Sequence, residues 1–341
     1  MKAMQLHRIV DLSKEKNPLK LDYIAEPLIN EDELLIKISV CGVCHTELDE
    51  IEGRTPPPIL PVILGHQAVG YIVDMGKHVS DFQKGDRVGV GWIYSSCGKC
   101  DYCLQGLENL CLEFKATGRD VNGGYAEYMK VGADFAHKIP EFYSDAEASP
   151  LFCAGAIGYR SLMLSQLKNG QLLGLTGFGA SAHLVIKLVR YKFPDTSIFV
   201  FARSEKERAF AMELGAAWTG DIGEKAPEHM HAIIDTTPVW KPIITSLENL
   251  RPGGRLVINA IRKEDYDKEY LKKLSYHEHL WMEKEIKSVA NVAKDDVREF
   301  LIIAAAAGIK PEIKEYAIED ANKALWEVKN SQIRGAKVLR I

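Results

Sequence analysis

The chain has 341 residues, 46% of them hydrophobic and 26% charged, which is enough for two globular domains with cores of their own. Its formal net charge of −4 argues against nucleic acid or an anionic membrane as the main partner. No apolar stretch approaches the roughly 20 residues of a membrane-spanning helix, and the N-terminus lacks the features of a signal peptide, so we expect a cytoplasmic protein.

The first part of the chain is predicted to be β-rich. Short apolar runs at Leu34–Val40 and Val69–Val73 are separated by Gly, Pro and Asp, and further strand-and-turn patterns occupy Gly85–Gly91 and Gly123–Val131. Three consecutive prolines at Pro56–Pro58 indicate a stiff loop. These features indicate one domain built mainly from strands.

Four of the seven cysteines stand within fifteen residues, spaced by two, two and seven other residues: Cys97, Cys100, Cys103 and Cys111. Such a cluster either staples a loop of a secreted protein with disulfides or holds a metal in an intracellular protein. We favour the metal, because thiols stay reduced in the cytoplasm and an odd number of cysteines would leave one unpaired. Four thiolates close a tetrahedron around Zn²⁺ and leave no position for a substrate, so we predict a structural zinc lobe.

The pattern changes after about Cys153. Strands are predicted at Leu172–Thr176, Ser197–Ala202, His231–Asp235 and Gly254–Asn259, and helices at Ala180–Tyr191, at Ser204–Leu214 and before Leu250. Strands that alternate with helices indicate βαβ units and a parallel sheet. An alanine-rich helix (Asp295–Ala307) and a last strand (Ala336–Ile341) follow, and we expect that strand to return to the sheet of the first domain.

A glycine-rich turn follows the first of these strands. Gly177 and Gly179 with Ala182 fit the form G-x-G-x-x-G/A, at the point where a strand meets a helix. The first glycine makes the tight turn, the second lets a pyrophosphate approach the backbone, and the small third residue lets helix and strand pack closely. We therefore predict a dinucleotide whose pyrophosphate lies at the N-terminus of the helix.

The end of the second predicted strand indicates which dinucleotide binds. NAD enzymes place Asp or Glu there for the ribose hydroxyls, whereas this chain has Arg203 and Ser204. The guanidinium suits a 2′-phosphate, with Ser204 donating a hydrogen bond, which favours NADP(H) over NAD(H). The alternative is that Arg203 is a solvated arginine beside Glu205 and Glu207.

Three further segments carry cysteine or histidine: Cys41–Asp49, Gly65–Gln67 and Leu151–Gly155. Alone, such a cysteine is more often a small core residue. Together with a dinucleotide fold and the four-cysteine lobe, they resemble the zinc-dependent medium-chain alcohol dehydrogenases. The resemblance runs nearly end to end, in the family order, through CGVCHTEL, LGHQAVG, GDRVGVGW, CGKCDYC, GGYAEY, LFCAGAIGY, GFGASAHL and LRPGGRLV.

This resemblance implies an α/β fold with two parts, a GroES-like β-rich catalytic domain and a doubly wound parallel-sheet Rossmann domain. We place the catalytic domain at residues 1–153, with the zinc lobe at 97–111, and the cofactor domain at 154–290. Residues 291–341 are expected to return to the catalytic domain.

By the same resemblance, Cys44, His66 and Cys153 hold a catalytic zinc, and the four-cysteine lobe holds a second, structural zinc. Two thiolates and a neutral imidazole would leave the catalytic zinc uncharged and with one open position, where an alcohol loses its proton more readily. Hydride then passes to the nicotinamide. Cys41 matches no ligand position and is expected in the core.

Other residues take roles from the family pattern. Thr46 matches the hydroxyl that takes the alcohol proton onward, and Glu47 matches the carboxylate that orients His66. His45 matches a residue that contacts the cofactor phosphate, and Trp92 matches a wall of the substrate pocket.

Two positions depart from that pattern. Many members have histidine five residues after the first zinc cysteine, where this chain has Asp49. An aspartate there either passes protons to water or leaves the relay to end at the ribose hydroxyl. Gln67 stands where the family commonly has glutamate behind the zinc, and the lost negative charge is expected to lower the pKa of a bound alcohol.

The expected function is a zinc-dependent, NADP- or NAD-linked alcohol dehydrogenase for small alcohols and their aldehydes or ketones. A polyol or sugar dehydrogenase of the same superfamily is the nearest alternative, ranked lower because Cys153, not a carboxylate, fills the third ligand position. A zinc-bound dinucleotide sensor without activity is the alternative from another class. The resemblance also implies a homo-oligomer, either a dimer or, as in microbial relatives, a tetramer.

Overall fold

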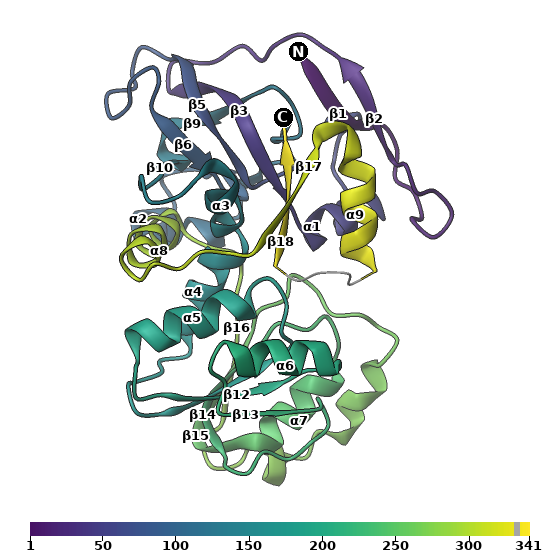
Figure 1. Ribbon diagram of the computed structural model, residues 1–341, viewed down its shortest axis with the longest axis vertical. Helices are drawn as coiled ribbons and strands as arrows, with labels where there is room; N and C mark the ends of the chain where they lie inside the picture. Colours follow the sequence, from purple (N-terminus) through teal and green to yellow (C-terminus); the bar gives the residue numbers. More distant parts are fainter. Residues whose placement is uncertain (331–334) are drawn as a thin grey trace. The chain divides into compact units, whose positions relative to one another are not determined.

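The computed structural model describes residues 1–330 and 335–341, which divide into two compact units (Figure 1). The first unit joins Met1–Ala156 to Val292–Ile341, and the second unit is Ile157–Asn291. Both ends of the chain therefore belong to the first unit, and the middle of the chain forms the second. Among the described residues, no helix combines the length and apolar character needed to cross a bilayer.

Within the described residues, the main sheet of the first unit has seven strands. Its order is β10-β6-β5-β3-β18-β17, and β9 also pairs with β3. The bounds are β3 Glu33–Val43, β5 Ala68–Met75, β6 Arg87–Val90, β9 Tyr128–Gly132, β10 Ala136–Lys138, β17 Ile313–Ala317 and β18 Ala336–Arg340. Strand β3 buries Leu34, Ile36 and Ile38 at alternate positions, so this face of the sheet packs on the core of the unit.

Two smaller sheets complete the strands of this unit. One has the order β2-β1-β4, and the other pairs β7 with β8. Their bounds are β1 Lys2–Leu6, β2 Leu19–Tyr23, β4 Val62–Ile63, β7 Ile93–Ser95 and β8 Lys115–Ala116.

The last strand of the chain lies inside the main sheet, between β3 and the edge strand β17. Strand β18 pairs antiparallel with β3, with Leu339 opposite Cys41, and parallel with β17 (Figure 1). The carboxyl end of the chain therefore supports the part of β3 that leads into helix α1 (His45–Ile51).

The described helices of the first unit range from 4 to 13 residues. Besides α1 they are α2 Asp101–Leu104, α3 Asp145–Ala148, α8 Lys294–Ala306 and α9 Ala321–Lys329, while α4 Ala154–Leu164 continues into the second unit. Helix α9 buries Ala321, Ala324, Leu325 and Val328, the spacing of an amphipathic helix with one face on a core.

The second unit is a parallel sheet of six strands in the order β13-β12-β11-β14-β15-β16. The bounds are β11 Leu172–Thr176, β12 Ser197–Phe201, β13 Trp218–Gly220, β14 Met230–Asp235, β15 Leu250–Ile258 and β16 Glu285–Ser288. In order of appearance this is 3-2-1-4-5-6, the Rossmann order, whose switch point lies between β11 and β14. Ligands of such sheets bind at the carboxyl ends of the strands beside that point.

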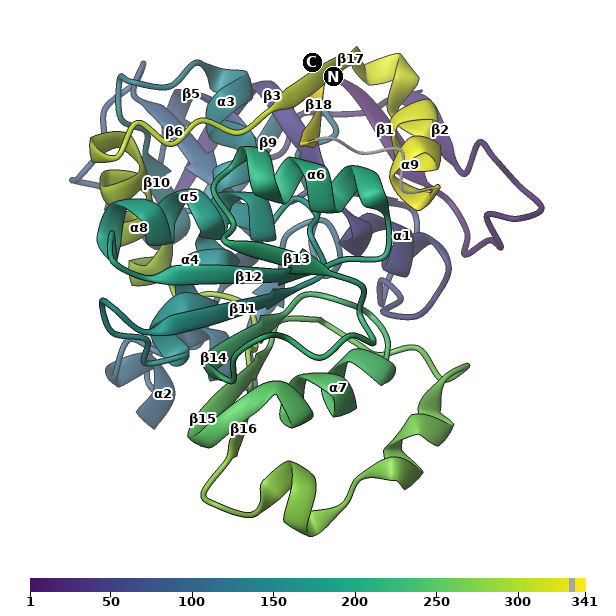
Figure 2. The same cartoon turned by 60° about the horizontal axis from the view of Figure 1, so that its bottom comes forward.

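Helices cover both faces of this sheet (Figure 2). Helices α5 (Ala182–Lys192) and α6 (Glu205–Glu213) lie on one face, and α7 (Lys241–Asn249) lies on the other. All five residues of β11 are buried, as expected for a central strand covered on both sides. The fold is therefore a β-rich unit plus a doubly wound parallel sheet, as the sequence predicted.

Candidate functional site

Cys44, His66 and Cys153 form a compact cluster within the first unit. One ligand atom from each lies within 4.8 Å of the others. Cys44 is the N-cap residue of α1, at the end of β3, and His66 lies between β4 and β5. Cys153 follows the short 3₁₀ turn Ser149–Phe152. Three separate parts of the chain thus bring two sulfurs and an imidazole together.

The two sulfurs of the cluster are strongly coupled. Cys44 Sγ lies 3.8 Å from Cys153 Sγ. The hydrogen bond from Cys153, together with His66, lowers the pKa of Cys44 despite its burial, and the same hydrogen bond raises the pKa of Cys153. Since two thiolates so close repel each other, the pair needs either one shared proton or a cation.

The imidazole is oriented by a buried carboxylate. His66 Nδ1 lies 2.6 Å from Glu47 Oε1, and both side chains are almost inaccessible to solvent. Burial opposes the charged ring, yet Glu47 and Cys44 raise the pKa of His66 well above its usual value. The second carboxylate oxygen of Glu47 accepts a hydrogen bond from the Cys44 backbone N–H at 2.7 Å. Glu47 therefore fixes both the ring of His66 and the start of α1.

This arrangement fits a zinc ion. The His66 Nε2 atom is buried and has no hydrogen-bond partner among the described residues. With Nδ1 held by Glu47, Nε2 is the nitrogen left to bind a metal, as in carboxylate–histidine–zinc arrangements. Two thiolates and one imidazole make a three-ligand set typical of a catalytic zinc with one position open.

The backbone around the cluster tolerates little change. Gly65 has φ +96°, and a Cβ there would lie 2.4 Å from the Tyr125 ring and 2.9 Å from Cys41 Sγ. A Cβ on Gly42 would lie 2.6 Å from the side-chain oxygen of Gln67, so that side chain packs directly on the β3 backbone. Cys41 is fully buried in the hydrophobic core and outside the cluster, in agreement with its predicted role.

Helix α1 carries the other residues expected at this centre. Thr46 Oγ1 lies 3.5 Å from Cys44 Sγ, so its hydroxyl borders the cluster. His45, the first residue of the helix, is exposed. Asp49 is buried, and its Oδ1 accepts a hydrogen bond from Arg54 Nε at 2.6 Å. This ion pair, which was not predicted, holds the Asp49 carboxylate in place.

The Trp92 ring packs against the guanidinium of Arg119. Its ring centroid lies 5.3 Å from that of Phe114 and 5.1 Å from Arg119 Cζ, while Arg119 also pairs with Asp120. Trp92 Nε1 is buried without a hydrogen-bond partner among the described residues. The indole N–H of this predicted pocket wall is therefore a hydrogen-bond donor without an acceptor among the described residues.

Helix α1 also carries a residue that was not predicted, Glu50. Glu50 is 1% exposed, and neither carboxylate oxygen has a hydrogen-bond partner in the described part of the chain. Burial, with the nearby Glu47, raises the pKa of Glu50 well above its usual value. Its position three residues after Glu47 places it on the inward face of α1, a helical spacing that the sequence could have revealed.

The four-cysteine lobe is also assembled. The Sγ atoms of Cys97, Cys100, Cys103 and Cys111 lie within 4.8 Å of one another. Cys97 Sγ is 3.9 Å from Cys103 Sγ, far beyond a disulfide bond of about 2.05 Å. Backbone N–H groups of Lys99 and Cys100 lower the pKa of Cys97 to about 6. The pKa of Cys100 is instead raised to about 11: the Cys103 backbone N–H opposes this rise, while burial and hydrogen bonds with Cys103 and Cys97 cause it. Because the sulfurs converge, all seven cysteines are free and one thiolate already forms readily, the lobe fits a zinc with four sulfur ligands.

The glycine turn of the second unit follows β11 at the switch point of the sheet. Gly177 has φ +80°, and a Cβ there would lie 2.8 Å from Thr236 Oγ1. A Cβ on Gly179 would meet no described atom within 4 Å, so this backbone faces open space. Ala182 is buried as the first residue of α5, where only a small side chain lets the helix approach the sheet.

Two arginines lie near the end of β12, Arg203 just after the strand and Arg208 on helix α6. Arg203 is exposed, as a ligand-binding guanidinium should be. The Ser204 hydroxyl caps α6 by accepting a hydrogen bond from the Glu207 N–H, a role that the sequence prediction did not consider. Arg208, also not predicted, donates to the carbonyl oxygens of Ala202 and Arg203 at 2.7 and 3.0 Å. This places a second guanidinium at the same strand end.

A buried ion pair lies at the carboxyl end of β14. Asp235 is fully buried, and its Oδ2 lies 2.5 Å from Lys263 Nζ. Lys263 also donates to the carbonyl oxygens of Thr237 and Val239. The ammonium group therefore ties the segment after β15 to the residues that follow β14, close to Gly177.

Known proteins resemble this chain along its whole length. The model of the alcohol dehydrogenase GroES-like domain matches residues 30–141. A probable alcohol dehydrogenase, AdhA, of Mycobacterium tuberculosis (strain CDC 1551 / Oshkosh) is 38% identical over 346 residues, covering 100% of this chain and 97% of that protein. An alcohol dehydrogenase of Geobacillus stearothermophilus is 32% identical over 335 residues, covering 96% and 97%.

Among solved structures, a cinnamyl alcohol dehydrogenase of Sorghum bicolor matches with a TM-score of 0.88 at 25% identity. The match covers 99% of this chain and 97% of the plant chain. The two units described above are thus shared with an enzyme of known structure.

Proposed function

The chain belongs to the zinc-dependent medium-chain alcohol dehydrogenase family, and from this premise we propose that it interconverts small alcohols with aldehydes or ketones, using a nicotinamide cofactor and two zinc ions per chain. The observation that carries this proposal is the cluster of Cys44, His66 and Cys153. Their chemistry is that of a zinc centre with room for a substrate oxygen.

Each residue of this centre has a task. When bound, zinc withdraws charge from a substrate oxygen and the nicotinamide exchanges a hydride. Cys44, His66 and Cys153 hold the metal, and Glu47 keeps the His66 ring in the orientation that leaves Nε2 free. Thr46, whose hydroxyl borders Cys44, receives the proton that leaves the alcohol.

The residues around this centre set its charge and shape. Asp49, whose carboxylate is held by Arg54, is proposed to pass the proton onward. Gln67 adds no charge behind the metal, Trp92 forms part of the substrate pocket, and His45 is assigned to the cofactor phosphate. The four-cysteine lobe has no open ligand position and is assigned a structural zinc.

We assign NADP(H) as the preferred cofactor. Arg203 is exposed at the end of β12, where NAD enzymes carry an acid. Arg208 lies nearby, but its Nη1 is 4.0 Å from Asp221 Oδ1, so the assignment depends on Arg203. The hydroxyl of Ser204 can still donate a hydrogen bond while it accepts one from the Glu207 N–H. Gly177, Gly179 and the buried Ala182 line the pyrophosphate turn.

Compartment and assembly are also part of the proposal. Seven free thiols and the composition favour the cytoplasm. Strand β16 forms an edge of the parallel sheet with all four residues exposed, which supports assembly into a dimer or tetramer through that edge. Sedimentation of the purified chain measures this directly, and a monomer would contradict it.

The test of the function is a panel of small alcohols, aldehydes, polyols and sugars, each assayed with NADP(H) and with NAD(H). We expect turnover of simple primary or secondary alcohols, with metal analysis giving two zinc ions per chain. Turnover confined to polyols or sugars would favour the alternative reaction, and absence of turnover in a chain holding two zincs would contradict the enzyme.

Arg203→Asp should shift the cofactor preference toward NAD(H). The change removes a charge-assisted bond to the 2′-phosphate and adds repulsion, so the ratio of kcat/KM for NADP to that for NAD should fall about 10- to 100-fold. Lys192→Asp, which makes the same charge change at the exposed end of α5, serves as the control and should leave the ratio within about twofold. An unchanged ratio in Arg203→Asp would remove the assignment of NADP(H).

A further inference from the structure

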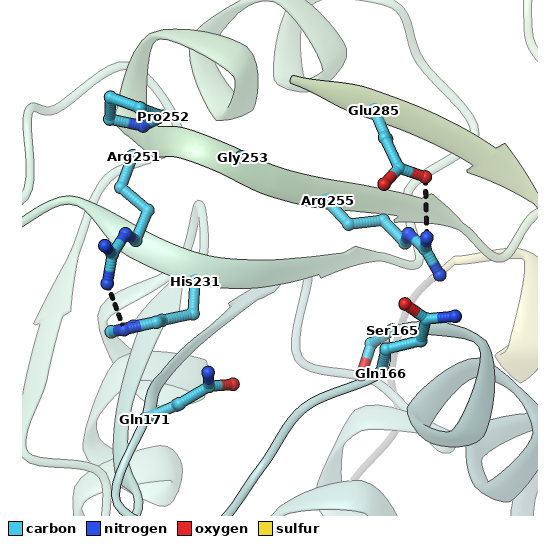
Figure 3. A pocket seen from close by; sticks show the side chains of 9 residues that line it. All are labelled: Ser165, Gln166, Gln171, His231, Arg251, Pro252, Gly253, Arg255 and Glu285. Atoms are coloured by element: carbon cyan, nitrogen blue, oxygen red, sulfur yellow. Dashed lines mark hydrogen bonds and ion pairs between the residues drawn. The ribbon is translucent and has the colours of Figure 1, made fainter. Parts of the chain in front are cut away.

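A polar pocket of about 260 Å³ lies in the second unit, away from the glycine turn. It is lined by residues at the amino ends of four parallel strands: Gln171 before β11, His231 on β14, Arg251 and Arg255 on β15, and Glu285 on β16 (Figure 3). Because the glycine turn follows the carboxyl end of β11, this pocket is at the opposite end of the sheet. The proposed dehydrogenase reaction gives it no role.

The protonation of His231 is fixed by a backbone contact. The Leu172 N–H donates a hydrogen bond to His231 Nδ1 at 3.1 Å, so Nδ1 must carry its lone pair. Burial and the neighbouring Arg251 lower the pKa of His231, which keeps the ring neutral at pH 7. The single ring proton is therefore on Nε2, and Nε2 is a donor.

That donor faces another donor. Arg251 Nη1 lies 2.5 Å from His231 Nε2, and every nitrogen of a guanidinium is a donor (Figure 3). Two N–H groups at this distance repel each other unless an acceptor lies between or beside them. Among the described residues, Arg251 has no carboxylate within ion-pair distance, so its charge is uncompensated.

The second arginine of the pocket, Arg255, has hydrogen-bond acceptors for its guanidinium. Arg255 Nη2 donates to Glu285 Oε2 at 2.6 Å, and its Nη1 donates to the Leu164 carbonyl oxygen at 2.9 Å. In Figure 3 this pair lies across the pocket from Arg251 and His231. Since Glu285 neutralises Arg255, one net positive charge remains, and it belongs to Arg251.

We propose that this pocket binds a phosphate-type oxyanion through the Arg251 guanidinium and the Nε2–H of His231. One oxygen of the anion accepts from Nε2–H and another accepts from the guanidinium, which converts a repulsive contact into two charge-assisted hydrogen bonds. The pocket is several times the roughly 30 Å³ occupied by one water molecule, so a phosphate or phosphoryl group fits. The ligand is either free phosphate or the phosphate of a small phosphomonoester.

Isothermal titration of the zinc-loaded protein with inorganic phosphate, at constant ionic strength in chloride, tests the proposal. We expect a saturable site with one phosphate per chain, and a rise in melting temperature of about 2–4 °C when phosphate exceeds its dissociation constant roughly tenfold. Arg251→Gln should weaken phosphate binding at least about tenfold, because it removes the charged donor. A parallel titration with phenyl phosphate separates the sources, since tighter binding of the monoester points to a phosphorylated metabolite.

The nucleotide turn also attracts phosphate, so Arg203→Gln is the matched control. Binding that persists in Arg203→Gln and disappears in Arg251→Gln supports the pocket, whereas the reverse pattern assigns the anion to the cofactor site and overturns the proposal. If Arg251→Gln fails to fold, Arg251→Lys replaces it and should bind phosphate more weakly than the parent chain. Equal affinity in Arg251→Lys, or no binding by the parent chain, would overturn the proposal.

Discussion

Cys153→Ala is expected to oxidise alcohols at least about 10³-fold more slowly than the parent chain and to keep one zinc ion per chain. The metal contributes several kcal/mol of charge stabilisation, and each 1.36 kcal/mol corresponds to tenfold in rate. Removing one sulfur leaves Cys44 and His66, too few ligands to hold zinc tightly. Plasma emission analysis and steady-state kinetics measure the two effects.

Cys41→Ala is the matched control for that variant. Cys41 stands three residues before Cys44 and is fully buried, but it lies outside both cysteine clusters. Its variant should retain both zinc ions and a rate within a few-fold of the parent, with a modest loss of stability from the cavity. If Cys153→Ala kept two zinc ions and the parent rate, the cluster would not be the reactive centre.

Lys263→Met is expected to lower the free energy of unfolding by about 3–5 kcal/mol, because it leaves the buried Asp235 carboxylate without its partner. The double variant with Asp235→Asn should recover part of this loss, since no buried charge remains. Lys268→Met, at an exposed lysine beside Asp265, should change stability by less than about 1 kcal/mol. Urea denaturation followed by tryptophan fluorescence gives these values.

The pH dependence of the Lys263→Met variant provides a second check. Burial raises the pKa of Asp235, so the folded state holds its proton more tightly than the unfolded state does. A raised folded-state pKa favours folding below that pKa, and the advantage is lost as pH rises through it. The loss in free energy of unfolding caused by Lys263→Met should therefore be largest at neutral pH and become smaller as the pH is lowered. A deficit that is constant with pH would mean that lost packing, not the uncompensated charge, causes it.

Sequence reasoning was strongest where local pattern and chemistry coincide. The buried run at Leu172–Thr176 and the glycine turn after it were recognisable because a central parallel strand is apolar throughout and the turn needs φ > 0 at Gly177. The four-cysteine lobe was recognisable because all its ligands lie within fifteen residues. Both features could be predicted because the residues that form them are close together in the sequence.

Elements that depend on distant partners were not predicted. Strand β13, Trp218–Gly220, has only three residues and exists through its pairing with β12. Strand β17 was not predicted because most of the residues in Ile313–Ala317 are exposed, so they form no clear apolar pattern. Helix α9 was not predicted because its apolar residues become recognisable as one face only when they pack on the core of the first unit.

The fold class and the four-cysteine lobe could be predicted because they depend on residue types at short, fixed spacings. The family and the ligands Cys44, His66 and Cys153 came from the resemblance of motifs spread along the chain. Other pairings became visible only in the folded chain: Asp49 pairs with Arg54, Asp235 pairs with Lys263, and Arg251 faces His231. The physical reason is that a side chain's charge and hydrogen bonds depend on atoms within a few ångströms, and these come from residues far apart in the chain.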